Sequence, residues 1–283
     1  MDLTSPKTIR EISDRFGFAF KKGLGQNFLT DKSVLSDIVE AASGAEGILE
    51  IGPGFGVLTY ELASHFEKVV AVEMDTALPR VLEYTLSEFD NVEIVMGDIL
   101  KTDVKALISE KFSGMKVSVA ANLPYYVTTP IISMLLTQKL PVSDIVIMIQ
   151  KEVAERICAK PGTKAYGALS VMCQYYSEPD MVCIAKAEVF VPAPKVDSAV
   201  IRMRVREKPP VEAKSEEFFF KTVQAAFSQR RKTLQNCITA YFKCSKESAA
   251  QAMEAVGIDL KRRGETLSLA EFAALSDKLL EIL

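Results

Sequence analysis

The feature that most limits the fold is a series of five apolar, Val/Ile-rich runs in the first 150 residues of this 283-residue chain. They lie at 47–52, 68–74, 91–98, 116–122 and 144–150, with amphipathic helical patterns such as "GVLTYELASHF" between them. Continuous apolar strands of this kind are buried on both faces, as in parallel sheets whose strands alternate with helices. The pattern therefore predicts an α/β fold built on a Rossmann-like parallel sheet.

The end of this pattern predicts a domain boundary. Extended segments near 181–191 and 197–206 follow the sheet, and the second alternates as "SAVIRMRVR", which is typical of a strand at a sheet edge with one solvated face. The segment "EKPPVEAKSEE" at 207–217 has the proline and charge content of a linker. We therefore expect an α/β catalytic domain over residues 1–206, which starts with an N-terminal arm of about 30 residues, and a small helical domain over 207–283.

Helical patterns fill the chain after the linker. "FFFKTVQAAF" and "KTLQNCITAYF" place apolar residues at spacings of three and four, and Ser268 with Glu271 has the spacing of a capping box. These signals predict that the C-terminal domain is all-helical.

A glycine-rich turn follows the first predicted strand, in "EIGPGFG" from Glu50 to Gly56. Glycines at a strand-to-helix turn allow a tight bend and a close approach of the backbone to a ligand. The dinucleotide fingerprint needs G-x-G-x-x-G, whereas Gly52, Gly54 and Gly56 give G-x-G-x-G and residue 57 is valine. This spacing disfavours NAD or FAD and favours S-adenosylmethionine, although a tight turn without a ligand remains an alternative.

Polar side chains end three further predicted strands. Glu73 ends the second, where it can accept hydrogen bonds from ribose hydroxyls, and Asp98 closes the third, where it can accept from an adenine amino group. Asn122 closes the fourth. Each alone can be a solvated strand cap, but open α/β sheets bind ligands at the carboxyl ends of their strands. The coincidence predicts a cofactor site.

The fourth strand stops at Asn122-Leu123-Pro124-Tyr125. Proline cannot donate to a strand ladder, so the backbone leaves the sheet in a rigid turn. The Asn122 side-chain oxygen and a carbonyl of the Leu123–Pro124 backbone can accept hydrogen bonds from an aromatic amine, and Tyr125 can stack on its ring. The alternative is a proline-terminated strand with a tyrosine in the core.

The glycine turn, residues 122–125 and "GLGQNFLTD" at 23–31 together resemble the adenine amino-group methyltransferases. "VFVPAPKVDSAV" at 189–200 and "AFSQRRKTLQN" at 226–236 are similar to segments of the KsgA-type ribosomal RNA small subunit adenine dimethyltransferases. The resemblance extends over almost the whole chain. It implies dimethylation, from S-adenosylmethionine, of two adjacent adenosines in the 3′-terminal hairpin of 16S rRNA within a small-subunit precursor.

The resemblance also implies roles for single residues. Asn27 and Leu29 match cofactor contacts of the family, and Gln26 is a less specific match. Phe190 matches an aromatic residue that lies against the target base opposite Tyr125, although a lone phenylalanine is more often a core residue.

The charge distribution favours an RNA contact in the second half of the chain. The net charge is −3, but the chain from Met181 onward has 17 Lys/Arg and 13 Asp/Glu, against 17 and 24 before it. We expect Arg230, Arg231 and Lys232 to contact RNA phosphates, although a charge run is often only a solvated face. Further candidate cations are Lys21, Lys22, Arg202, Arg204, Arg206, Lys261, Arg262 and Arg263.

Other classes of protein fit less well. The glycine spacing disfavours an NAD oxidoreductase, and the H-x-E and P-C-x-x-C ligands of zinc base deaminases are absent. The five cysteines form no C-x-x-C pair, so we expect no metal site or disulfide framework. No secretion signal and no apolar run of membrane-spanning length is present, which favours a cytoplasmic protein, and we expect a monomer. An Erm-type enzyme acting on large-subunit (23S) rRNA and a non-catalytic ribosome assembly factor remain as alternatives.

Overall fold

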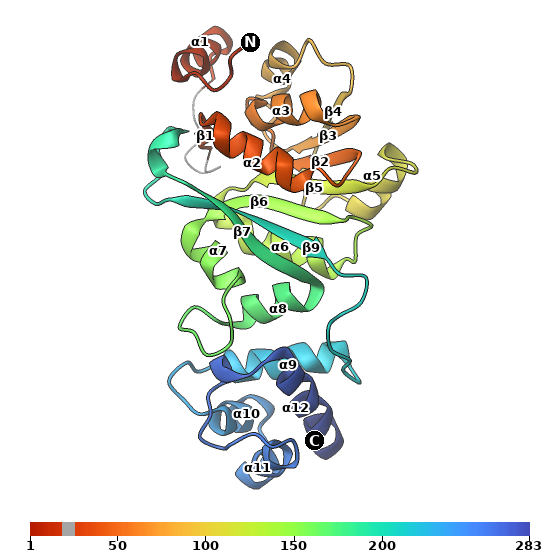
Figure 1. Ribbon diagram of the computed structural model, residues 1–283, viewed down its shortest axis with the longest axis vertical. Coiled ribbons are helices and arrows are strands. Elements are labelled where there is room, and N and C mark those ends of the chain that lie inside the picture. Colours follow the sequence, from red (N-terminus) through yellow and green to blue (C-terminus); the bar gives the residue numbers. More distant parts are fainter. Residues whose placement is uncertain (19–25) are drawn as a thin grey trace. The chain divides into compact units, whose positions relative to one another are not determined.

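The computed structural model describes residues 1–18 and 26–283 (Figure 1). Contacts divide the chain into two compact units. One unit consists of Met1–Ala154 and Glu178–Val205, and the other of Glu155–Ser177 and Arg206–Leu283.

The first unit is built on a seven-stranded sheet with the order β4-β3-β2-β5-β6-β9-β7. Its strands are β2 (Gly47–Ile51), β3 (Lys68–Glu73), β4 (Val92–Met96), β5 (Val117–Asn122), β6 (Asp144–Gln150), β7 (Ser177–Ala185) and β9 (Ser198–Val205). The five strands from β2 to β6 pair in parallel, and β9 pairs with β6 in the antiparallel direction. The predicted α/β, Rossmann-like fold class is confirmed.

Helices and turns connect these strands. They are α1 (Pro6–Phe16), α2 (Lys32–Ala42), α3 (Val57–His65), α4 (Pro79–Thr85), α5 (Val104–Lys111), η2 (Tyr125–Val127), α6 (Thr128–Thr137), α7 (Lys151–Ile157) and η3 (Ala187–Val189). Aspartates cap two of them: Asp31 accepts a hydrogen bond from Ser33 N at the start of α2, and Asp103 accepts one from Ala106 N at the start of α5. All five residues of β2 are buried, which is consistent with its continuous apolar sequence and with helices on both faces.

The predicted N-terminal arm contains helix α1 and the short strand β1 (Phe28–Leu29). Arg15 of α1 lies over the ring of Tyr84 in α4, 4.2 Å from its centroid, and Phe16 packs against the same ring. These contacts hold the start of the chain against the sheet unit.

The extended segment expected near 181–191 is interrupted. Strand β7 ends at Ala185, the turn η3 follows, and β8 (Phe190–Val191) leaves the large sheet to pair with β1. Asp197 stabilises this break, because its carboxylate accepts hydrogen bonds from Ala187 N and from Lys186 Nζ.

The expectation that residues 197–206 form an edge strand is wrong. Strand β9 lies between β6 and β7 in the sheet. Its charged side chains pair with neighbouring strands: Arg202 with Asp144 of β6 at 2.7 Å, and Arg204 with Asp180 of β7 at 3.1 Å. The alternation therefore reflects cross-strand ion pairs and not an open edge.

The second unit is helical, with α8 (Ala168–Tyr176), α9 (Glu216–Phe227), α10 (Leu234–Phe242), α11 (Lys246–Ala255), η4 (Gly264–Thr266) and α12 (Leu269–Ile282). Helix α8 belongs to it because Tyr175 stacks on Phe219 at 4.9 Å and Tyr176 on Phe220 at 5.6 Å. The contacts therefore group residues 155–177, expected in the first domain, with the C-terminal helices.

The capping box expected at the start of α12 is confirmed. Ser268 Oγ accepts a hydrogen bond from Glu271 N at 3.2 Å, and the Glu271 carboxylate accepts one from Ser268 N at 2.8 Å. Among the helices of the described residues, none is both long and apolar enough to cross a membrane.

Candidate active site

A pocket opens at the carboxyl ends of the parallel strands, where the strand order reverses between β2 and β5. Connections from these two strands diverge, and open α/β sheets bind ligands at such a switch point. All of the predicted cofactor and catalytic positions line this pocket: Asn27, Leu29, Gly52, Gly54, Glu73, Asp98, Asn122, Leu123, Pro124, Tyr125 and Phe190. The roles of these residues stay predictions, but the large sheet and the short β1–β8 pair together bring them to one pocket.

The glycine turn lines the pocket next to the end of β2. Gly54 has a φ of +59°, and a Cβ atom there would lie 2.7 Å from the ring of Phe28. Phe28 in turn stacks on Phe55, with ring centroids 4.4 Å apart. Glycine is therefore required at position 54 both by its backbone conformation and by the arm residue packed against it.

Glu73 lies at the end of β3 with only 5% of its surface exposed. Its Oε1 accepts a hydrogen bond from Asp75 N at 2.7 Å, and its Oε2 accepts one from Gly54 N at 3.3 Å. Burial raises its pKa despite these donors. The carboxylate therefore joins the acidic turn after β3 to the glycine turn after β2.

Asp98 is the second predicted acid of the pocket. Its Oδ1 accepts a hydrogen bond from Leu100 N at 3.1 Å, and Lys101 Nζ lies 3.6 Å from Oδ2. The side chain is partly exposed, so acceptor capacity is left for a ligand.

Glu50 is a functional candidate that the sequence interpretation did not assign. The residue lines the pocket but is 1% exposed, and its Oε2 has no hydrogen-bond partner among the described residues. Burial raises the pKa of this carboxyl to about 8, with a smaller rise from the Glu73 carboxylate. An acidic residue inside the apolar run "GILEIG" was the signal available in the sequence.

The turn after β5 is rigid and presents specific acceptors. Leu123 N donates to Met148 O of β6 at 3.1 Å, which continues the ladder for one residue. The Pro124 carbonyl is engaged by Val127 N at 3.2 Å and by the Thr128 hydroxyl at 3.1 Å. The Pro124 carbonyl is therefore occupied, whereas no hydrogen bond to the Leu123 carbonyl is formed among the described residues, so this carbonyl can accept one from a ligand.

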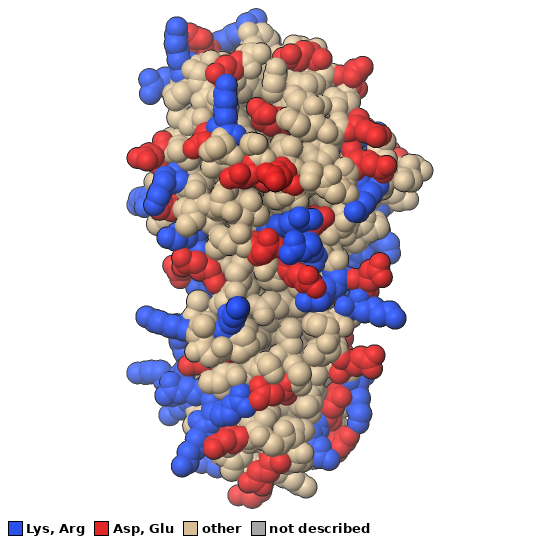
Figure 2. Space-filling view, in the orientation of Figure 1, with Lys and Arg blue, Asp and Glu red and all other residues tan. Residues whose placement is uncertain are grey.

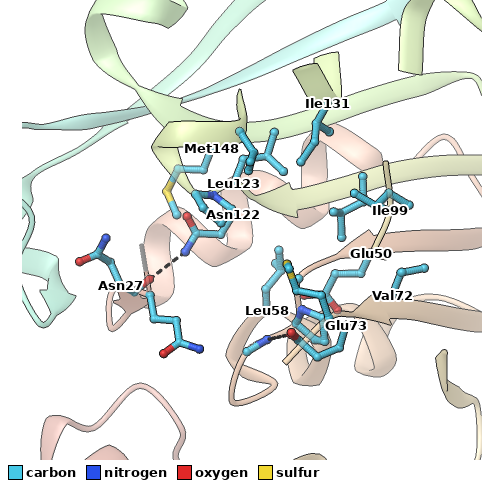
Figure 3. A pocket seen from close by; sticks show the side chains of 18 of the residues that line it. Asn27, Glu50, Leu58, Val72, Glu73, Ile99, Asn122, Leu123, Ile131 and Met148 are labelled. Carbon is cyan, nitrogen blue, oxygen red and sulfur yellow. Dashed lines mark hydrogen bonds between the residues drawn. The ribbon is translucent and has the colours of Figure 1, made fainter. Parts of the chain in front are cut away.

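The Asn122 side chain points from the end of β5 into the same pocket (Figure 3). Its Nδ2 donates to the Asn27 carbonyl at 3.0 Å, so its Oδ1 is the atom available as an acceptor. This contact between residues 95 positions apart joins the N-terminal arm to the turn.

Two aromatic residues stand near the turn. The Tyr125 hydroxyl shares a hydrogen bond of 2.8 Å with Ser198 Oγ, and burial raises the pKa of this phenol. Phe190 is 3% exposed, lines the pocket from β8 and is paired with Leu29 of β1. Both rings can therefore contribute an apolar wall for a planar ligand.

The predicted RNA-binding residues lie in the helical unit, between α9 and α10. Arg230, Arg231 and Lys232 are exposed, and Arg230 Nη2 donates to the Lys164 carbonyl at 2.9 Å. On the face drawn in Figure 2, basic side chains gather at the left margin over the helical unit. The exposure of Arg230, Arg231 and Lys232 leaves their charged side chains accessible to solvent.

Several of the other candidate cations are paired within the protein. Arg202 and Arg204 hold carboxylates of neighbouring strands, and Arg262 donates to both oxygens of Glu271. Lys21 and Lys22 lie outside the described residues. Arg230–Lys232 therefore remains a basic candidate, together with the exposed Lys261 and Arg263.

The side chains of the pocket fit a nucleoside cofactor. Carboxylates of Glu73 and Asp98 suit hydroxyl and amino donors, while Met74 and Ile99, which follow them in the sequence, add apolar surface to the lining of the pocket. Among the described residues, no three His, Cys, Asp or Glu side chains are grouped as a metal site. The single histidine, His65, is on α3 and bonds through Nδ1 to the Glu61 carbonyl at 2.7 Å.

The chain is similar to known proteins over nearly its whole length. The family described as "Ribosomal RNA adenine dimethylase" matches residues 17–279. A curated relative from Geobacillus thermodenitrificans, "Ribosomal RNA small subunit methyltransferase A", is 52% identical over 287 residues, covering 99% of this chain and 98% of that protein. The protein of the same name from Bacillus mycoides is 51% identical over 285 residues, with coverage of 99% and 98%.

Solved structures share the fold. A dimethyladenosine transferase from Plasmodium falciparum matches with a TM-score of 0.73 and 24% identity, covering 88% of this chain and 95% of that one. The 23S rRNA methyltransferase ErmE matches with a TM-score of 0.68 and 26% identity, covering 89% and 99%.

Proposed function

The chain belongs to the ribosomal RNA adenine dimethylase family, and we propose that it dimethylates the exocyclic amino nitrogen of two adjacent adenosines in the 3′-terminal hairpin of 16S rRNA. The family predicted from the sequence is confirmed. The choice of the small subunit is supported by relatives of that name that are about 50% identical over their full length. The observation that carries the chemistry is the Asn122–Tyr125 turn in the wall of the pocket.

S-adenosylmethionine, the methyl donor, supplies an electrophilic methyl carbon bound to a positively charged sulfur. Glu73 is assigned to the ribose hydroxyls, and Asp98 to the adenine amino group of this donor. Backbone groups at Gly52 and Gly54, with Asn27 and Leu29 of the arm, complete its binding site. Both acids and both glycines line one pocket, which supports the assignment.

The turn activates the amine. An adenine amino group is a weak nucleophile because its lone pair is delocalised into the ring. Asn122 Oδ1 and the Leu123 carbonyl accept hydrogen bonds from its hydrogens, which favours a tetrahedral nitrogen and aims the lone pair at the methyl carbon. Pro124 fixes the turn, so these acceptors need little reorganisation during the reaction.

The reaction needs no strong base. The nitrogen forms a bond to the methyl carbon while the bond from that carbon to sulfur breaks, and the alkylated nitrogen then releases a proton to water. The pocket has to accept the monomethylated amine as its next substrate, so only one hydrogen remains for the two acceptors in the second round.

The target base has to leave its stack before it can reach this pocket, and hairpin loops of RNA allow this at low cost. Tyr125 and Phe190 are assigned to opposite faces of the base, where a base–aromatic stack contributes about 1–3 kcal/mol. Arg230, Arg231 and Lys232 of the helical unit bind RNA phosphates, while the sheet unit carries catalysis. The enzyme acts as a monomer on a small-subunit precursor in the cytoplasm, without a metal.

Transfer to isolated ribosomal subunits tests this function. Purified protein is supplied with labelled S-adenosylmethionine and with unmethylated small or large subunits in separate reactions, and modified nucleotides are mapped. We expect two methyl groups on each of two adjacent adenosines near the 3′ end of the small-subunit RNA. Label only in the large subunit would overturn the target, and cofactor binding without any transfer would favour an assembly factor.

A further inference from the structure

The orientation of the Asn122 amide is decided by a residue far away in the sequence. Its Nδ2 donates to the Asn27 carbonyl at 3.0 Å (Figure 3). If the amide were turned over, two oxygens with lone pairs would face each other, which is unfavourable. The Asn27 carbonyl therefore sets which atom of Asn122 is offered to the pocket, and that atom is the acceptor Oδ1.

The Asn27 carbonyl is itself held from both sides. After it, Phe28 stacks on Phe55 at 4.4 Å, and Thr30 donates through both its N–H and its hydroxyl to the Val189 carbonyl at 2.8 Å. Before it, Gln26 Nε2 donates to Asp75 Oδ2 at 3.1 Å. The position of this carbonyl thus depends on a side-chain bond at one end and on packing and strand pairing at the other.

Asp75 is suited to act as an anchor. It is 4% exposed, and its Oδ1 accepts a hydrogen bond from Ala77 N at 3.1 Å. Its own N–H donates to Glu73 Oε1 at 2.7 Å. A buried carboxylate that loses one donor is strongly destabilised, so Gln26 contributes more here than a solvent-exposed amide would.

We infer that Gln26 and Asp75 are positioning residues for methyl transfer, because their hydrogen bond holds the Asn27 carbonyl where it orients Asn122 Oδ1 toward the amine. The inference rests on the proposed function, since it acts through the assigned role of Asn122. The hydrogen bonds continue from Asp75 through Glu73 to Gly54. The carboxylates assigned to the methyl donor and the Asn122 oxygen assigned to the amine therefore belong to one network.

Single-turnover kinetics with small subunits as substrate test the pair. Gln26→Leu removes the donor with little change in volume, and we expect the methyl-transfer rate to fall roughly ten- to a hundredfold. The dissociation constant for S-adenosylhomocysteine should change by less than about threefold, because the lost hydrogen bond orients Asn122 Oδ1 toward the amine and does not hold the cofactor. A rise in that dissociation constant with an unchanged methyl-transfer rate would show that Gln26 only contacts the methyl donor, and would overturn the inference.

A second background separates positioning from a general loss of structure. In Asn122→Ala there is no amide left to orient, so adding Gln26→Leu should change the remaining rate by less than about twofold. An equal loss in both backgrounds would mean a structural defect and would contradict the inference.

Reversing the polarity of the bond provides a rescue. Gln26→Glu places two carboxylates together and should slow transfer, whereas Gln26→Glu combined with Asp75→Asn restores one donor and one acceptor with the same total charge. We expect the double variant to recover most of the lost rate, and no recovery would count against the pair.

If the wild-type protein transfers no methyl group to either subunit, the proposed function fails and this inference fails with it. A normal wild-type rate with an unaffected Gln26→Leu variant rejects the inference alone.

Discussion

At the scale of single residues, the two polar atoms of the Asn122 side chain have different tasks. Nδ2 is bonded to the Asn27 carbonyl, while Oδ1 remains for the substrate. The neighbouring Leu123 N is tied to Met148 O, which fixes the backbone of the turn. A small rotation of either group would misdirect the acceptors, and enzymes lose rate steeply with such misplacement.

Replacing Asn122 tests its assigned role. In Asn122→Ala, we expect cofactor affinity to stay within a few-fold of wild type, because most of the donor site is unchanged. Turnover should fall by roughly 100-fold or more, as for other losses of a preorganised polar group. Calorimetry with S-adenosylhomocysteine and a labelled-methyl assay measure the two quantities, and normal turnover would refute the role.

Glu50 gives a prediction about pH. Its pKa is about 8 in the folded protein and near 4.5 when unfolded, so the folded state holds this proton over a range where the unfolded state has lost it. Its contribution to stability is therefore fully present below about pH 4.5 and is lost as pH rises to about 8. Glu50→Gln cannot ionise, so it should gain stability relative to wild type across this window, by about 2–5 kcal/mol in total.

Urea unfolding at pH 5 and pH 8 measures the difference in free energy of unfolding between wild type and Glu50→Gln. Any destabilisation by the buried amide that does not depend on pH is the same at both pH values and cancels when the two differences are compared. Glu83→Gln, at an exposed position of α4, serves as the matched control and should show no such trend. An equal difference between wild type and Glu50→Gln at both pH values would contradict the assignment of a neutral buried carboxyl.

Some of these residues could be predicted from the sequence and others could not. The gathering of Glu73, Asp98 and Asn122 at one pocket was predictable because strand ends of a parallel sheet meet at one edge, while their roles stay predictions. The bonds from Gln26 to Asp75 and from Asn122 to Asn27 connect positions 49 and 95 residues apart, and no local pattern encodes such contacts.

At the scale of elements, the parallel strands were predictable because their sequences are continuous Val/Ile-rich runs. Most of them are buried, and β4, at one edge of the sheet, is half-buried. Strand β9 was misplaced because alternation alone does not distinguish an exposed edge from an interior strand with cross-strand ion pairs. The two-residue strands β1 and β8 are too short for any periodicity, and only their pairing defines them.

The start of α12 provides a test at this scale. Hydrogen bonds from Arg262, helped by those from Ser268, lower the pKa of Glu271 to about 2. A carboxylate with a lowered pKa stabilises the fold above its unfolded pKa of about 4.5, and this contribution is lost as pH falls toward 2. Glu271→Gln should therefore be less stable than wild type at pH 7, with a difference that shrinks by pH 3.

Thermal unfolding of both proteins at the two pH values checks this expectation. Glu254→Gln, on the exposed side of α11, is the matched control and should show no pH-dependent difference. A difference in stability between wild type and Glu271→Gln that is as large at pH 3 as at pH 7 would count against the ion pair with Arg262.

At the scale of the whole molecule, the chain combines a sheet unit that contains the pocket with a helical unit that carries Arg230–Lys232. Contacts divide the chain between Val205 and Arg206, close to the proline- and charge-rich segment from which we predict a domain boundary. The grouping of residues 155–177 with the helices was not, because it depends on aromatic contacts between α8 and α9.

The basic segment gives a prediction for RNA binding. If Arg230, Arg231 and Lys232 contact phosphates, their replacement by alanine should reduce the slope of log K against log salt by about 0.7–0.9 per contact. A matched triple variant removes Lys214, Lys221 and Lys278, which belong to the same unit but pair with Glu281 or Glu217. Its slope should stay close to wild type, and equal slopes for all three proteins would reject the phosphate contacts.

The central claim is that the rigid turn from Asn122 to Tyr125 lies beside the reactive methyl group of the donor. A crystal structure with S-adenosylmethionine bound tests it most directly. We expect the methyl carbon to face the space bounded by Asn122 Oδ1 and the Leu123 carbonyl, where an amine nitrogen can approach it in line with the sulfur. A donor bound with its methyl group directed away from this turn would contradict the account.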